Sequence, residues 1–213
     1  MEDPRREIME TLFGRGASLV GFADLGDVPD ESRLGMPRGI SIAVALSPGV
    51  VSGIGRGPTA DYEREYARVN ALLATLGEIA GELLRRRGWR VSIPSPTTEA
   101  FPPDLRTPLP HKTVATRAGL GWIGKNALLV TRPFGSAVRL TSVLTDAPFT
   151  ADGPIDRSNC GTCRACVDAC PGHAPQGTNW ALGLDRNAFF SAGDCLRTCG
   201  EVTARAGLGV HTI

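Results

Sequence analysis

Apolar residues in the first 150 positions follow two kinds of spacing, one typical of helices and one of buried strands. Helical spacing covers residues 4–16 and the stretch from Thr59 to about Arg87. Short apolar runs bounded by Gly, Pro or Asp predict strands at residues 19–23, 39–46, 89–93, 126–131 and 138–145. Because these strands alternate with helices, we predict a mixed-sheet α/β (α+β) domain over residues 1–150.

The longest predicted helix carries a single apolar stripe. Its members follow one another at alternating intervals of four and three residues, which places them on one face: Tyr62, Tyr66, Val69, Leu73, Leu76, Ala80 and Leu83. Burial against a sheet or another helix is enough to explain such a stripe. We therefore assign it to the core and not to a cofactor site.

All six cysteines lie in residues 151–213, a segment that begins with a polar, turn-rich stretch. Four of them form one run, C-x2-C-x2-C-x3-C, which is followed at once by Pro171: Cys160, Cys163, Cys166 and Cys170. This spacing, including the proline, is typical of the iron–sulfur ligands of bacterial ferredoxins. We predict a small ferredoxin-like domain over 151–213, whose folding energy comes largely from metal ligation.

Zinc is the main alternative for this run, because C-x2-C is also half of a zinc site. Structural zinc usually joins two such halves across a longer loop, whereas these gaps follow without a break. A disulfide framework fits poorly, since six cysteines in 213 residues are few and no secretory signal peptide opens the chain.

Charge and hydropathy exclude some classes of partner. The net charge of +1 gives no electrostatic argument for nucleic acid. The longest apolar stretch, at 40–46, is far too short to span a bilayer, so we expect no membrane association. Reduced thiols and a charged N-terminus together predict a cytoplasmic protein.

Residues 119–126 read G-L-G-W-I-G-K-N and nearly match two nucleotide-binding motifs. Both motifs require a strand before the glycines and a helix after them. Here the preceding segment has the composition of a helix and the following one that of a strand, and Asn126 stands where a phosphate-binding loop needs Ser or Thr. We predict a helix C-cap and a tight turn, with Trp122 and Ile123 packed inward.

The stretch from residue 108 to the cysteine run resembles the epoxyqueuosine reductase family and its shorter relatives with a double 4Fe–4S cluster domain. The resemblance runs from about Gly57 to the C-terminus. It implies cobalamin on the α/β domain, one or two 4Fe–4S clusters, an electron donor such as a ferredoxin or flavodoxin, and tRNA as a substrate. It also places six residues near a cofactor cavity: Gly119, Gly121, Trp122, Gly124, Lys125 and Ser136.

The chain departs from the family pattern at the proposed proton donor. A gapless alignment puts Leu105 where the tRNA-modifying reductase has an aspartate, and Asp104 is one residue out of register. Asp104 is therefore our candidate catalytic acid. His111 is a possible substitute, although a single loop histidine is more often structural.

A second departure concerns the number of thiolates, because two clusters need eight and this chain has six. The family arrangement implies that Cys160, Cys163 and Cys166 await a fourth ligand from a second cysteine run beyond Ile213. It assigns Cys170 and Cys195 to the other cluster. Cys199 has no role by resemblance, but it could complete a single cluster with the first three.

Three functions remain open at this point. The first is an iron–sulfur redox protein that transfers electrons to a cofactor or substrate held by the α/β domain, and as an enzyme it would be a cobalamin-dependent reductase. The second is an electron-transfer or cluster-binding protein without catalysis. The third is a zinc-stabilised interaction module.

Overall fold

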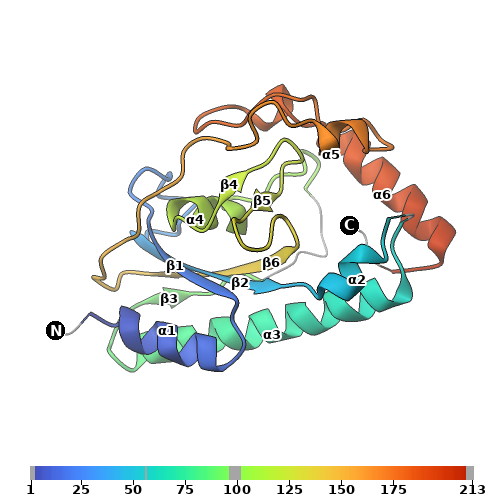
Figure 1. Ribbon diagram of the computed structural model, residues 1–213. Coiled ribbons are helices and arrows are strands. Elements are labelled where there is room, and N and C mark those ends of the chain that lie inside the picture. The colour runs from blue at the N-terminus through green and yellow to red at the C-terminus, as the bar shows by residue number, and fades with distance from the viewer. Residues whose placement is uncertain (1–2, 56, 96–101, 210–213) are drawn as a thin grey trace.

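The computed structural model describes residues 3–55, 57–95 and 102–209. At its centre is a four-stranded sheet with the order β1-β2-β6-β3, in which every neighbouring pair is antiparallel (Figure 1). The strands are β1 (Leu19–Asp24), β2 (Arg38–Ala45), β3 (Val91–Ser92) and β6 (Val138–Thr145). The predicted combination of helices and strands is confirmed, but the sheet is antiparallel and not mixed.

Strand β2 is the most buried part of this sheet. It pairs with β1 from Leu19 opposite Ala43 and with β6 along its whole length. Six consecutive residues of β2, from 39 to 44, are buried. A strand that is buried on both faces reads as a continuous apolar run, which is the pattern seen in the sequence.

Helices cover both faces of the sheet. Helices α1 (Arg5–Gly14) and α3 (Ala60–Arg85) lie on one face of the sheet. Helix α4 (His111–Arg117) lies on the other face (Figure 1). The Thr59 side chain caps α3 by accepting a hydrogen bond from the backbone N–H of Tyr62 at 3.2 Å. The predicted stripe of α3 is buried except at Tyr66 and Leu83, which are half-buried. The fully buried residue of the last turn is Leu84.

The predicted strand at 126–131 is shorter than expected and lies outside the main sheet. Only Leu129–Val130 (β5) is extended, and it pairs with β4 (Trp122–Ile123) in a separate two-stranded sheet. The chain between them turns at Ala127, whose φ is 59° and whose N–H donates to the carbonyl of Gly124 at 2.9 Å. A tight turn therefore replaces the first half of the predicted strand.

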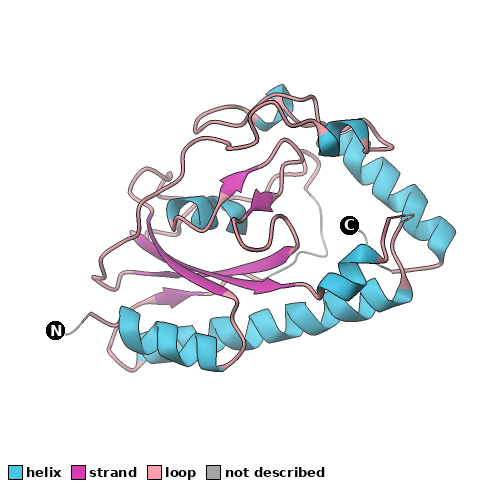
Figure 2. Cartoon of the chain, in the orientation of Figure 1, coloured by secondary structure: helices cyan, strands magenta, loops and turns pink. Residues whose placement is uncertain are grey.

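Residues 151–209 contain no strand and are mostly loops, as the colouring in Figure 2 shows. Their helical elements are α5 (Ala165–Asp168), the 3-10 turn η1 (Arg186–Ala188) and α6 (Ala192–Ala206). A further short helix, α2 (Pro48–Ser52), follows β2. The chain after α6 returns to the start of α3, where the N–H of Gly209 donates to Glu63 Oε1 at 2.7 Å. Among the described residues, no helix has the length and apolar character needed to cross a bilayer.

Candidate functional site: a cavity beside two groups of cysteines

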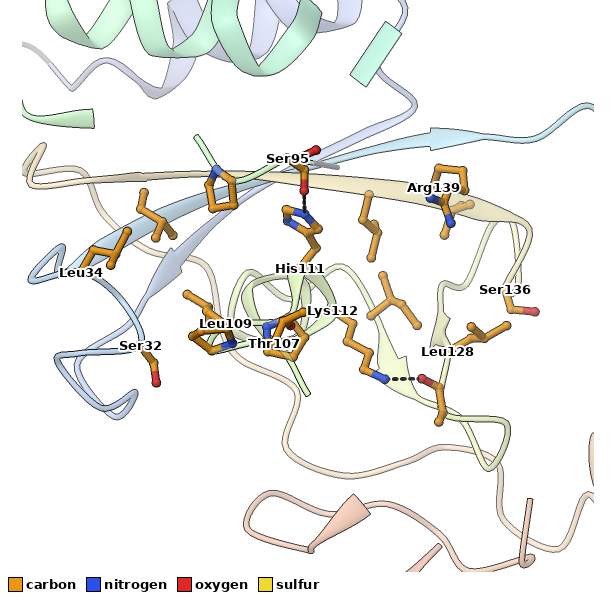
Figure 3. Close-up of a pocket in the computed structure, with 18 of the residues that line it drawn as sticks. Ser32, Leu34, Ser95, Thr107, Leu109, His111, Lys112, Leu128, Ser136 and Arg139 are labelled. Carbon is orange, nitrogen blue, oxygen red and sulfur yellow. Dashed lines mark hydrogen bonds between the residues drawn. The ribbon is translucent and has the colours of Figure 1, made fainter. Parts of the chain in front are cut away.

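A cavity of about 510 Å³ lies between β6, α4 and the loops around them (Figure 3). Its lining is largely aliphatic and, among the described residues, includes no carboxylate. The residues with polar side chains at its wall are Ser32, Tyr66, Ser95, Thr107, His111, Lys112, Ser136 and Arg139. A site of this size, apolar with a few polar groups, is typical of small-molecule binding.

Lys112 lies in this wall with its ammonium group close to the protein backbone. Its Nζ donates to the carbonyl of Ala127 at 2.7 Å, which is its one acceptor among the described residues. Burial lowers the pKa of Lys112 to about 8, with a smaller contribution from the nearby cation of Arg186. The ammonium therefore has hydrogen-bond donors to spare at the cavity wall.

His111 is the first residue of α4 and both of its ring nitrogens are engaged. Nε2 lies 2.7 Å from the carbonyl of Ser95, which can only accept, so Nε2 carries the proton and donates. Nδ1, 3.0 Å from Ser142 Oγ, then accepts. Burial lowers the pKa of His111 below its ordinary value, which keeps the ring neutral. A neutral ring with both nitrogens bonded is a structural element and a poor proton donor.

Asp104 lies away from the cavity lining and is exposed. Its Oδ1 accepts from the backbone N–H of Arg106 at 3.1 Å. Arg186, from η1, holds this loop by donating to the carbonyls of Asp104 at 2.8 Å and of Leu105 at 2.6 Å. The loop is thus fixed to the C-terminal segment, and the catalytic role of Asp104 stays a prediction.

Of the six residues expected near a cofactor, Ser136 lines the cavity. The other five belong to the glycine segment, which follows helix α4 and contains β4. This order of a helix before the glycines and a strand after them matches the order that the sequence predicted. The segment faces β5 and the cysteine run instead of the cavity.

The glycines of this segment permit close backbone approach. A Cβ on Gly121 would lie 2.2 Å from the carbonyl oxygen of Val130, and one on Gly119 would lie 2.7 Å from that of Gly153. Gly119 also has a φ of +69°, the left-handed conformation of a helix C-cap. These two positions require glycine, because any larger residue would displace backbone atoms.

Two side chains of the same segment reach the cysteine run. Trp122 Nε1 donates to Cys160 Sγ at 3.4 Å. Lys125 Nζ donates to the carbonyls of Gly161 at 2.9 Å and of Cys163 at 2.8 Å. Lys125 is 4% exposed, so its charge is almost completely removed from water.

Cys160, Cys163 and Cys166 form a first group of thiols. Burial alone would raise the pKa of the Cys160 thiol, but hydrogen bonds from Ser158 and Trp122 outweigh it and hold that pKa below its ordinary value. Burial, together with the neighbouring Cys160 and Cys163, raises the pKa of Cys166. The three sulfurs are therefore close enough to interact electrostatically.

Cys170, Cys195 and Cys199 form a second group. The Sγ atoms of Cys195 and Cys199 are 3.9 Å apart on α6. The pKa of Cys195 is raised, mainly by the hydrogen bond with Cys199 and also by burial and by repulsion from Cys170. The cation of Lys112 acts in the opposite direction and lowers that pKa. The second group thus adjoins the cavity wall. The alternative in which Cys199 joins the first three thiols stays a prediction.

The six cysteines form no disulfide. Within the described part of the chain, no three His, Cys, Asp or Glu side chains gather tightly enough to hold one metal ion. A four-iron cluster binds each thiolate through a different iron, so its ligands stand farther apart than those of a single ion. The thiols are compatible in chemistry with cluster ligation. The Sγ atoms of Cys195 and Cys199, at 3.9 Å, are as close as two ligands of a single ion, so these two side chains would have to move apart to bind different irons of one cluster.

Sequence reasoning passed over Lys112 and Arg139 as site residues. Arg139 Nε donates to Asn70 Oδ1 at 3.1 Å and its Nη2 donates to Tyr66 Oη at 2.9 Å, which fixes the guanidinium at one end of the cavity. The sequence offered one signal for Lys112, since the chain has only two lysines.

The chain is similar to an epoxyqueuosine reductase of Synechococcus sp. (strain RCC307), with 33% identity over 172 residues. This alignment covers 80% of the chain and 44% of that protein. The chain spans less than half the length of the curated relatives that it matches most strongly. No family model matches it.

Two solved structures share the fold. One is an epoxyqueuosine reductase crystallised with an epoxyqueuosine-modified stem loop of tRNA-Tyr, at 20% identity and a TM-score of 0.59 over 90% of this chain and 56% of that one. The other is a reductive dehalogenase described as B12-dependent, at 20% identity and a TM-score of 0.64 over 78% of this chain and 24% of that one.

We predict that Gly121→Ala destabilises the protein by about 1–3 kcal/mol or more, since the added methyl overlaps the Val130 carbonyl. Gly153→Ala is the matched control, because a Cβ there meets nothing within 4 Å. Its effect should stay within about 0.5–1 kcal/mol. Chemical denaturation of both variants measures the difference, and equal stabilities would refute the close approach at Gly121.

Proposed function

The chain belongs to the epoxyqueuosine reductase-like family, and on this basis we propose that it is an iron–sulfur redox protein that passes electrons toward a cofactor in the cavity. One observation carries the proposal. The six cysteines interact electrostatically in two groups of three, and Cys195 of the second group also interacts with Lys112, which lines the cavity. This arrangement provides two electron-carrying positions, one of them next to the binding site.

Each group supplies three of the four thiolates that a 4Fe–4S cluster uses. Cys160, Cys163 and Cys166 would hold the first cluster, within the ferredoxin-like domain proposed for residues 151–213. Cys170, Cys195 and Cys199 would hold the second. Cys199 enters this set because its sulfur lies beside that of Cys195, at a position where the family resemblance assigns no ligand.

The cavity fits part of a corrin in its chemistry. A planar macrocycle needs apolar surface, which the lining provides through residues such as Leu129, Val138 and Leu140. The peripheral amide carbonyls of a corrin accept hydrogen bonds, and Lys112 and Ser136 offer donors at the wall. A bound corrin would supply a cobalt centre that takes up electrons and delivers them to a substrate.

Two residues of the chain are placed to manage protons near such a cofactor. Asp104 is the family-based candidate, but it is exposed and lies outside the cavity lining. Lys112 lies in the wall, and its pKa of about 8 suits proton exchange near neutral pH. We propose Lys112 as the group that holds a proton at the cavity, with Asp104 as the alternative.

The partners follow from the same proposal. Electrons would come from a small low-potential donor such as a ferredoxin or flavodoxin, through the first cluster. A solved relative holds a tRNA stem loop, and we propose tRNA as a substrate only on that resemblance. The net charge of +1 gives the chain no charge excess of its own for binding a polyanion.

The main rival is a zinc-stabilised module. Its support is the C-x2-C spacing, and the absence of a tight single-ion group among the described residues weighs against it. An electron-transfer protein without catalysis shares the clusters but has no use for the cavity. The metal content of the purified protein distinguishes the zinc module from the proposed function. Corrin binding distinguishes the electron-transfer protein without catalysis from it.

We predict that protein purified anaerobically contains iron and acid-labile sulfide in near-equal amounts. Cys166→Ser should remove the cluster of the first group, because a serine oxygen is a poor substitute for a thiolate on iron, while the second cluster remains. Iron and sulfide analysis of the parent and variant measures this. Stoichiometric zinc without iron in the parent protein would contradict the proposal.

Cobalamin should bind to the cluster-loaded protein and change its visible spectrum. Ser136→Trp should weaken this binding at least about tenfold, because the indole fills space at the wall of a small-molecule site. Thr75→Trp is the control, since Thr75 is exposed on α3 and away from the cavity. Equal affinities for the parent and both variants would place the corrin elsewhere, and no binding at all would favour electron transfer without catalysis.

A further inference from the structure

Lys125 carries a buried charge that no carboxylate neutralises within the described part of the chain. Its Nζ has two acceptors, the carbonyls of Gly161 and Cys163, and both are dipoles without net charge. The residue is 4% exposed. Removing an ammonium from water costs several kcal/mol unless an opposite charge compensates it. The position therefore calls for an anion that the described side chains do not otherwise supply.

The nearest groups that can become anionic are the thiols of the first group. Lys125 lies close enough to interact electrostatically with Cys160 and Cys166. Three thiolates around an iron–sulfur cluster would give this pocket a net negative charge. The buried ammonium and the cysteine run are thus complementary when the thiolates hold a cluster.

The hydrogen bonds of Lys125 also fix the shape of the cysteine run. Its two acceptors belong to the short loop between Cys160 and Cys163, where Gly161 has a φ of +54°. Lys125 and its acceptors are 36 and 38 residues apart in the sequence. The ammonium therefore ties the cysteine loop to the turn that follows β4.

We propose that Lys125 is a positioning residue that sets the reduction potential of the cluster held by Cys160, Cys163 and Cys166, an inference that rests on the proposed function. The cluster gains one negative charge when it takes up one electron, and no bond forms or breaks. A nearby buried cation stabilises the reduced, more negative form. Lys125 thereby raises the potential and makes the first cluster easier to reduce.

The test compares two variants of the full chain, loaded anaerobically with iron and sulfide. Lys125→Met keeps the length of the side chain and removes the charge. Lys125→Arg keeps the charge and the ability to donate to both carbonyls. Each protein is reduced stepwise with dithionite and followed by electron paramagnetic resonance, and the signal of the first cluster is the one that Cys166→Ser abolishes.

We expect the equilibrium constant for reduction of the first cluster to fall about tenfold or more in Lys125→Met, a shift of about 59 mV per tenfold to more negative potential. Lys125→Arg should stay near the parent value. If Lys125→Met alone fails to assemble the first cluster, Lys125 acts in cluster assembly and not on the potential, which overturns the proposal. An unchanged potential in Lys125→Met would overturn the proposal. Loss of the first cluster in both variants, or an equal shift of its potential in both, would overturn it as well.

Arg164 provides a matched control within the cysteine run. It is also a cation, but its side chain is 57% exposed, so water and salt screen its charge. Arg164→Met should shift the potential much less than Lys125→Met does. Parent protein that binds no iron would instead refute the proposed function, so the two failures are distinguishable.

Discussion

The backbone contact between Gly121 and Val130 is the constraint on which the site depends. It brings β4 against β5 at a distance that excludes any side chain at position 121. The hairpin carries Trp122 and Lys125 on the side that faces the cysteine run. The same hairpin contributes Leu129 to the cavity wall. A single close approach thus positions groups that act on both the thiols and the binding site.

Buried and half-buried cations dominate the electrostatics around this hairpin. Lys125 adjoins the first thiol group, Lys112 lies between the second group and the cavity, and Arg139 closes one end of the cavity. Arg117 of α4 is also buried and pairs with Asp156 at the start of the C-terminal segment. Such an arrangement favours anionic occupants, and it fits centres that gain negative charge on reduction.

Much of the sheet could be predicted from the sequence, because buried strands and an amphipathic helix leave local patterns. Strand β6 has the predicted bounds, and β1 and β2 differ from prediction by a residue at their ends. The strand order and the antiparallel pairing depend on contacts between distant segments and left no such pattern. The first half of the strand predicted at 126–131 is instead a turn at Ala127. The backbone of Ala127 has a positive φ there, although the apolar composition favoured a strand.

The site was predictable in its residue types but not in its connections. The cysteine spacing pointed to a cluster, and the glycines of 119–124 pointed to a tight turn. The sequence could not show that Lys125 reaches Gly161, because that contact joins loops from two separate segments. For the same reason it could not show that Lys112 faces the cavity.

Mössbauer spectroscopy of protein loaded anaerobically with iron-57 tests the central claim most directly, because it reports the iron species and not only the metal content. We predict the signature of delocalised mixed-valence iron pairs, as in a 4Fe–4S cluster. Cys166→Ser should lose the part of this signal that comes from the first cluster, and Cys195→Ser should lose the part that comes from the second. A spectrum of isolated, oxygen-bound iron that neither substitution changes would contradict the assignment of the six thiols to clusters.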